Sequence, residues 1–225
     1  PKVVIADKKY VLQETQQNEV VIAPYDAKNI YLMQIHNENK PWTADSEPIV
    51  TLFNEYFGGG MNTIVFQELR EARGLAYSAS AWYNTPSVKD DPEWYYTNII
   101  SQNDKMMDAV KAFDEIIDNM PQSEAAFNIA KENIIANLRT TRIKGQGVIN
   151  YWLNLQKHGL SEDPNKELFE KVQQFTLQDV VDFQSQVIKD RKYVIGILGS
   201  EKDLDMKALN PAKYGKVERV SLEDI

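Results

Sequence analysis

Two short segments near the start of the chain are rich in β-branched and aromatic residues. They cover residues 19–23 and 30–35, and the turn-forming residues Pro24, Asp26 and Asn29 lie between them. This pattern predicts two strands that pair with each other.

Helical spacing of apolar side chains replaces this pattern after Pro48. The first predicted helix ends at the glycines 58–60, and a second follows at once and ends at Gly74. Residues 75–83 and 93–101 then change to a strand pattern. We expect these two strands to form an antiparallel pair.

The second half of the chain is mainly helical. Predicted helices cover residues 104–120, 123–138 and 148–158, a further one begins after Asp163-Pro164, and another follows the capping-box sequence Thr176-x-x-Asp179. We expect the first two of these helices to pack antiparallel. The last predicted regular element is the apolar strand Tyr193–Leu198.

The order of strands, helices, strands, helices and a final strand predicts an α+β fold. Such a fold has a mainly antiparallel sheet, with helices covering one of its faces. Residues 1–225 contain no internal repeat and no low-complexity linker, so they are predicted to form a single structural unit.

Composition narrows the classes of partner. Hydrophobic residues make up 43% and charged residues 26% of the 225 positions, which is enough to bury a core. A net charge of -8 argues against nucleic acid as a partner, because nucleic-acid binders neutralise phosphates with a basic face. The chain has no cysteine and therefore no disulfide, thiol nucleophile or Cys-ligated metal.

The sequence contains no apolar run of about 18 residues, and we therefore expect no membrane contact through a spanning segment. Residues 1–7 also lack an apolar signal segment. Because the chain begins with Pro1 rather than methionine, we expect it to be a processed or excised piece of a longer protein.

The most informative block runs from Phe57 to Tyr77 and reads FGGGMNTIVFQELREARGLAY. It resembles the glycine-rich helix–strand segment of the insulinase/pitrilysin family of metallopeptidases, which includes the mitochondrial processing peptidases. The motif Leu-Arg-x-x-x-x-Leu-x-Tyr falls on Leu69, Arg70, Leu75 and Tyr77. The helical layout that follows is similar to one family half over nearly the whole chain.

The resemblance implies that this chain is the C-terminal, non-zinc half of such an enzyme. Arg70 and Tyr77 would then reach across a closed chamber to the substrate backbone and to the developing oxyanion. A guanidinium and a phenol are suitable hydrogen-bond donors for these oxygens. Spacing alone leaves another interpretation open, in which Arg70 and Arg73 are solvated helix-end cations and Tyr77 is a core aromatic. Arg73 does not match the family position.

A zinc site is not predicted in this chain. In the family that this chain resembles, the metal half carries an H-x-x-E-H helix. His36 and His158 are the only histidines of this chain, and neither has a second histidine or a spaced carboxylate pair beside it. The sequence therefore predicts no metal and no cofactor on this chain, and the resemblance places zinc on the partner half. Neither histidine lies near a nucleophile-elbow sequence, so a Ser-His-Asp triad is unsupported as well.

Two further features have structural interpretations. The glycines 58–60 are not followed by Gly-Lys-Ser/Thr, so we interpret them as a helix stop and a tight turn that allows close backbone approach, rather than as a phosphate loop. A cluster of aromatics is expected to divide between the two sheet faces, mostly through cross-strand packing, and could also line a peptide chamber or meet a partner. It comprises Trp82, Tyr83, Trp94, Tyr95 and Tyr96.

Three functional hypotheses follow. The first is a half of a zinc endopeptidase that supplies Arg70 and Tyr77 to a zinc site on an N-terminal half or partner subunit, with a peptide as substrate; alone, this chain would be inactive. The second is a non-catalytic scaffold subunit of the same family, and the third is an independent peptide-binding module. Resemblance to bacterial members with exported relatives favours the periplasm over the cytoplasm.

Overall fold

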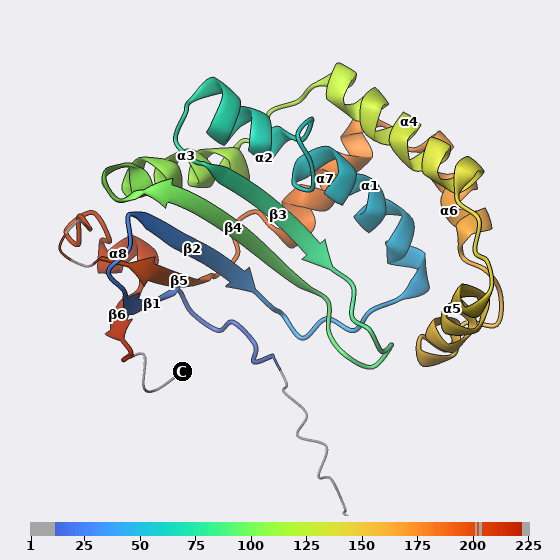
Figure 1. Ribbon diagram of the computed structural model, residues 1–225, viewed down its shortest axis with the longest axis horizontal. Helices are drawn as coiled ribbons and strands as arrows, with labels where there is room; N and C mark the ends of the chain where they lie inside the picture. The colour runs from blue at the N-terminus through green and yellow to red at the C-terminus, as the bar shows by residue number, and fades with distance from the viewer. Residues whose placement is uncertain (1–11, 201, 203, 222–225) are drawn as a thin grey trace, which may run out of the picture.

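The computed structural model describes residues 12–200, 202 and 204–221. Residues 1–7, for which no signal segment is predicted, lie outside the described part. Its strands form one six-stranded sheet in the order β3-β4-β2-β5-β1-β6. Figure 1 shows this sheet beside the helices. The strands are β1 (Glu19–Pro24), β2 (Asn29–His36), β3 (Ser78–Asn84), β4 (Trp94–Gln102), β5 (Val194–Gly199) and β6 (Lys216–Arg219).

The sheet is mixed. β3, β4, β2 and β5 are joined by antiparallel pairings, whereas β1 runs parallel to both β5 and β6. The predicted antiparallel pairing of β3 with β4 is confirmed, with Trp82 opposite Tyr96. The predicted pairing of β1 with β2 is wrong, because β5 lies between them. Tyr25, just after β1, donates its backbone N–H to Gly199 O at the end of β5 at 2.8 Å, so the chain crosses over β5 before β2 begins.

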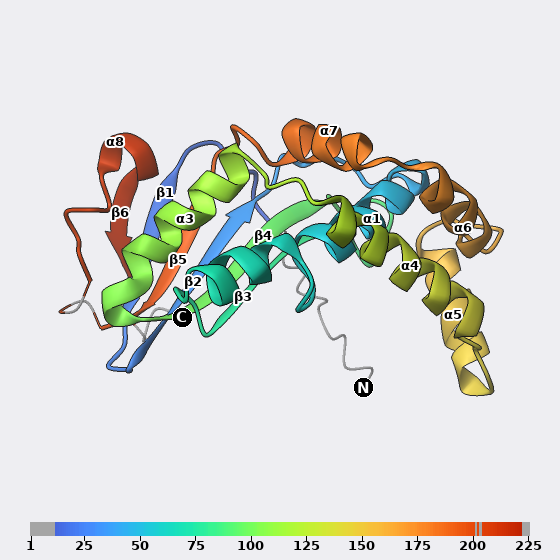
Figure 2. The same ribbon diagram turned by 90° about the horizontal axis from the view of Figure 1, so that it is seen from above.

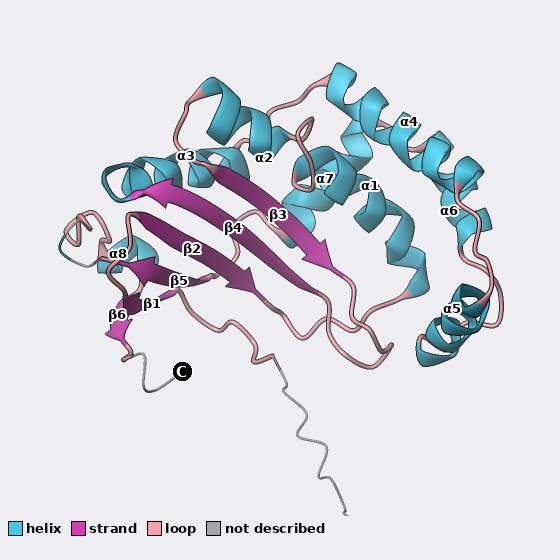
Figure 3. Ribbon diagram, viewed as in Figure 1, coloured by secondary structure: helices cyan, strands magenta, loops and turns pink. Residues whose placement is uncertain are grey.

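Helices make up most of the remaining chain, as the secondary-structure colours of Figure 3 show. Short helical turns are η1 (Ala44–Ser46), α2 (Ile64–Phe66), η2 (Gln67–Ala72), η3 (Asn103–Lys105) and α8 (Pro211–Tyr214). The longer helices are α1 (Glu47–Phe57), α3 (Met106–Asp118), α4 (Glu124–Thr140), α5 (Gln146–Lys157), α6 (Asn165–Gln174) and α7 (Leu177–Val187). Among the described residues, no helix combines the length and the apolar character needed to cross a membrane.

One face of the sheet is buried under helices. On β2 the side chains of Ile30 and Leu32 are buried, whereas Tyr31 and Met33 on the other face are exposed. Rings from two helices fill the core, since Phe53 of α1 stacks on Phe57 and meets Phe183 of α7. The predicted α+β class, with helices on one face, is confirmed.

Two expectations for the helical half need correction. The helix 123–138, observed as α4, was expected to pack on the preceding helix, but its helical neighbours are α1 and α6. Figures 1 and 2 show α4, α5 and α6 extending beyond the end of the sheet. Tyr193–Leu198 is also not the last regular element, because α8 and β6 follow β5.

Candidate functional site

The candidate site is built on the short helix that follows the glycine turn. Ile64, Val65 and Leu69 are buried and fix this helix to the core. It begins as α2 but continues through η2 as a π-helix. Single π-turns inside helices are rare and are frequently found at functional sites. Arg70 lies on this π-helical segment.

Gly74 ends the helix and turns the chain into β3. Its φ of 59° lies in the left-handed region, which favours glycine. Leu75 N–H donates to Leu69 O at 2.9 Å and Gly74 N–H donates to Arg70 O at 3.1 Å. These two bonds span six and four residues, one more each than in a Schellman motif, and they satisfy two carbonyls left over at the helix end. The turn at Gly74 thus places Arg70 just before it and Tyr77 just after it.

The side chain of Arg70 is partly exposed and has only weak restraints. Its guanidinium carbon lies 4.8 Å from the ring centroid of Phe66, one helical turn earlier, which is within cation–π distance. Its Nε lies 3.7 Å from a carboxylate oxygen of Glu71. Since neither contact occupies all of the guanidinium donors, Arg70 can still donate to a bound molecule.

Tyr77 is 75% exposed, although its backbone is fixed. Its N–H donates to Ile100 O of β4 at 2.8 Å, which holds the residue at the start of the sheet. Within the described part of the chain its hydroxyl has no hydrogen-bond partner. The alternative interpretation of Tyr77 as a core aromatic is therefore wrong.

Arg73 differs from Arg70 in being engaged within the fold. Its guanidinium pairs with Glu115 of α3 at 2.7 Å and lies 3.7 Å from Glu68. These ion pairs connect the end of η2 to α3, so Arg73 fits the interpretation of a helix-end cation. Glu115 is 42 residues away in the sequence, and no local pattern could have identified it as the partner.

The glycine turn lies against the edge strand β3. Ala81 N–H donates to Gly58 O at 3.1 Å. A Cβ atom on Gly58 would lie 1.9 Å from Ala81 O, and one on Gly59 would lie 2.3 Å from the ring of Trp82. The predicted close backbone approach is therefore confirmed for Gly58, whereas Gly59 lies against a side-chain ring.

The aromatic cluster divides between the two faces of the sheet as alternation predicts. Tyr83 and Tyr95 are buried on the helix-covered face. Trp82, Trp94 and Tyr96 are partly exposed on the other face, where Trp94 stacks on Tyr96 at 5.2 Å between ring centroids. This open face thus carries a row of aromatic rings on the edge strand β3 and its neighbour β4.

Both histidines are engaged by backbone carbonyls. His36 is buried, and its Nδ1 lies 2.7 Å from Lys192 O; burial lowers the pKa of its imidazole. His158 has Nδ1 2.8 Å from Asn154 O and Nε2 2.8 Å from Pro86 O. Neither ring is placed as a zinc ligand, and the described residues contain no group of three or more His, Cys, Asp or Glu side chains arranged for a metal.

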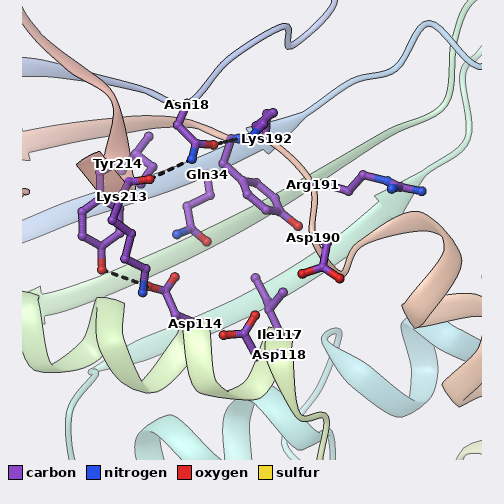
Figure 4. Close-up of a pocket in the computed structure, with 12 residues that line it drawn as sticks. Asn18, Gln34, Asp114, Ile117, Asp118, Asp190, Arg191, Lys192, Lys213 and Tyr214 are labelled. Carbon is purple, nitrogen blue, oxygen red and sulfur yellow. Dashed lines mark hydrogen bonds and ion pairs between the residues drawn. The ribbon is translucent and has the colours of Figure 1, made fainter. Parts of the chain in front are cut away.

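A pocket of about 290 Å³ lies elsewhere, between α3, β2, α8 and the segment before β5 (Figure 4). Asp114 accepts hydrogen bonds from Lys213 Nζ at 2.5 Å and from the Tyr214 hydroxyl at 2.9 Å. Burial, followed by the Asp114 carboxylate, raises the pKa of Tyr214 to about 12. Asn18 also donates to Lys213 O at 2.8 Å. Because these contacts join α8 to α3 and to the residue before β1, we interpret them as structural.

Comparisons with known proteins identify the family of this chain. Residues 2–134 match the family model described as the peptidase M16 inactive domain. A search of curated proteins gives no match.

Solved structures share the fold at low sequence identity. The peptidase M16 inactive domain from Pseudomonas fluorescens is 17% identical, with a TM-score of 0.68, over 82% of this chain and 44% of that chain. The periplasmic protease PqqL from Escherichia coli is 16% identical, with a TM-score of 0.62, over 84% of this chain and 21% of that chain. A chain of complex III2 from Candida albicans is 17% identical, with a TM-score of 0.60, over 85% of this chain and 48% of that chain. The chain thus spans half or less of each of these structures.

Proposed function

Since the chain belongs to the family of M16 peptidase inactive domains, we propose that it is the non-zinc half of a zinc metalloendopeptidase. The observation that carries this proposal is the segment from η2 to β3, where one helix end and one strand start present Arg70 and Tyr77. Zinc is expected on a companion half, because His36 and His158 are both committed to backbone carbonyls.

In this proposal Arg70 and Tyr77 act on the peptide. The guanidinium of Arg70 donates to a backbone carbonyl or carboxylate of the substrate, and its stacking on Phe66 limits its rotation. The Tyr77 hydroxyl, free to donate, stabilises the oxygen that gains negative charge in the tetrahedral transition state. Both side chains are exposed, as groups that reach a substrate held on another half must be.

The test uses the enzyme assembled from this chain and its zinc-carrying half. Tyr77→Phe removes one donor to the developing oxyanion, and we expect kcat to fall roughly 10²–10³-fold. Arg70→Ala should lower kcat/KM by a comparable factor, with part of the loss in KM. Arg73→Ala is the matched control, because Arg73 is held in ion pairs with Glu115 and Glu68 and should leave kcat/KM nearly unchanged.

A second function is favoured by one observation, the similarity of this fold to a chain of complex III2. A scaffold subunit would assemble with its partner but would not need Arg70 or Tyr77. If the assembled enzyme kept full activity with both residues replaced, the catalytic-support role would be lost and the scaffold role would remain. A peptide-binding module would instead bind unfolded peptides without a companion, which calorimetry with a peptide library measures directly.

A further inference from the structure

Helix α5 is unusual in this chain because it is exposed and carries no charged side chain before its last residue, Lys157. Residues 145–156 contain no Asp, Glu, Lys or Arg, although 26% of the whole chain is charged. None of the residues of α5 is buried. Its large apolar side chains are instead about half exposed: Val148 53%, Ile149 52%, Trp152 56% and Leu153 45%.

These four side chains form one stripe along the helix. Val148 and Trp152 are four residues apart, as are Ile149 and Leu153, so each pair lies on one side of the helix in successive turns. Figures 1 and 2 both place α5 at the end of the molecule, away from the sheet. We call these four apolar residues, Val148, Ile149, Trp152 and Leu153, the α5 stripe.

The inner side of α5 is fixed to the rest of the fold. The Tyr151 hydroxyl donates to Asp163 at 2.7 Å and accepts from Asn165 Nδ2 at 3.0 Å. His158, at the other end, contacts Pro86 O at 2.8 Å, and its ring lies 5.0 Å from that of Trp42. The α5 stripe is therefore held in a defined position, and docking on it would cost little conformational entropy.

The size of the α5 stripe argues against a dimer held by this surface alone. A helix of this length is about 18 Å long. Its exposed side is too small to supply the roughly 800 Å² that each partner contributes to a standard stable interface. The α5 stripe thus fits one contact of a larger interface.

A membrane surface is also a poor match. Helices that lie on membranes usually carry several lysines or arginines on their polar side. Within α5 the only such residue is Lys157, at its last position. The absence of charge from 145 to 156 instead resembles the core of a permanent protein interface, where charged residues are depleted.

The comparisons indicate a partner of suitable size. This chain covers 44% of the M16 inactive-domain structure from Pseudomonas fluorescens and 48% of the complex III2 chain, so each of these contains a further portion about as long as this chain. We propose that the α5 stripe docks on an uncharged, apolar patch of the companion peptidase half. This inference rests on the proposed function, because it assumes that such a half exists.

The experiment measures binding between this chain and the H-x-x-E-H half encoded with it, each purified separately, by calorimetry. Trp152→Glu places a charge within the α5 stripe, and we expect it to raise the dissociation constant at least 30-fold. Ile129→Glu is the control, because Ile129 is an exposed apolar residue on α4, outside the stripe, and should change the constant less than threefold. Thermal melting of both variants should match the wild type, since neither side chain is buried.

Three results would overturn the inference. If Trp152→Glu bound the zinc half as tightly as the wild type does, the α5 stripe would not be in the interface. Loss of activity in Arg70→Ala would still support the proposed function in that case. Failure of the wild-type chain to bind the zinc half would remove both proposals. Trp152→Glu could instead leave binding to the zinc half unchanged and abolish self-association, which would assign the stripe to a second copy of the chain. If it abolished binding to anionic lipid vesicles in the same way, the stripe would be assigned to a membrane.

Discussion

Gly58 and Gly59 show how individual positions shape the candidate site. Gly58 approaches Ala81 of β3 so closely that its carbonyl accepts the N–H of Ala81, and the ring of Trp82 covers Gly59. The third glycine, Gly60, has no atom within 4 Å of the position its Cβ would take. Three glycines in a row therefore differ in how much they tolerate a side chain.

Gly58→Ala is expected to destabilise the protein by about 1–3 kcal/mol, the usual cost of forcing an extra carbon into a packed site. The clash is with backbone, which cannot rotate away as a side chain can. Gly60→Ala is the control and should be neutral or slightly stabilising, because alanine restricts the unfolded chain. Urea unfolding of the three proteins measures both effects, and equal stabilities of the two variants would contradict the geometry.

Several of these residue-level features could be predicted from the sequence. The block from Phe57 to Tyr77 identified Arg70 and Tyr77 as the candidate pair. The partner of Arg73 could not be predicted, because Glu115 reaches it from α3 through tertiary packing.

The helix end at Gly74 connects local sequence to the position of the candidate pair. Gly74 was predicted as a helix stop. The physical reason is its left-handed backbone, together with the hydrogen bonds from Gly74 N–H to Arg70 O and from Leu75 N–H to Leu69 O. The π-helical character of η2 was not predicted. An apolar pattern over one and a half turns is too short to distinguish an α-helix from a π-helix, so the sequence contains no signal for it.

Gly74→Ala should cost about 1–2 kcal/mol, because an L-residue with a Cβ atom is strained at a φ of 59°. Gly74→Asn should cost less, since asparagine tolerates the left-handed region better. No atom lies within 4 Å of a Cβ at this position, so the difference reports backbone strain and not packing. Thermal unfolding of both variants gives the comparison, and an equal loss for alanine and asparagine would show that strain is not the cause.

The sheet is the part of the whole molecule that sequence analysis predicted least well. Strand positions were read correctly for β1 to β5, but the insertion of β5 between β1 and β2 joins segments more than 150 residues apart. Alternation of apolar residues shows which face of a strand is buried, not which strand lies beside it. The helix-covered face and the α+β class were predictable because they depend on that alternation alone.

His36 lies on β2. Its Nδ1 atom is 2.7 Å from the carbonyl oxygen of Lys192, which lies just before β5. The side chain is buried, and burial is the main reason why the pKa of its imidazole lies below the ordinary value of 6.5. Glu38 opposes this shift and Arg191 reinforces it. Protonation of His36 is therefore coupled to the stability of the junction between β2 and β5.

The sign of this coupling follows from proton binding. Between the folded-state pKa of His36 and about 6.5, the unfolded chain binds more protons than the folded one, so the free energy of unfolding falls as pH decreases through this window. His36→Gln keeps an amide donor for Lys192 O but cannot be protonated. We expect wild type to lose more stability than His36→Gln between pH 7.5 and pH 5, measured by urea unfolding at each pH, with His158→Gln as the control for the second histidine. Parallel pH profiles of wild type and His36→Gln would contradict this coupling, because every other titrating group is common to both proteins.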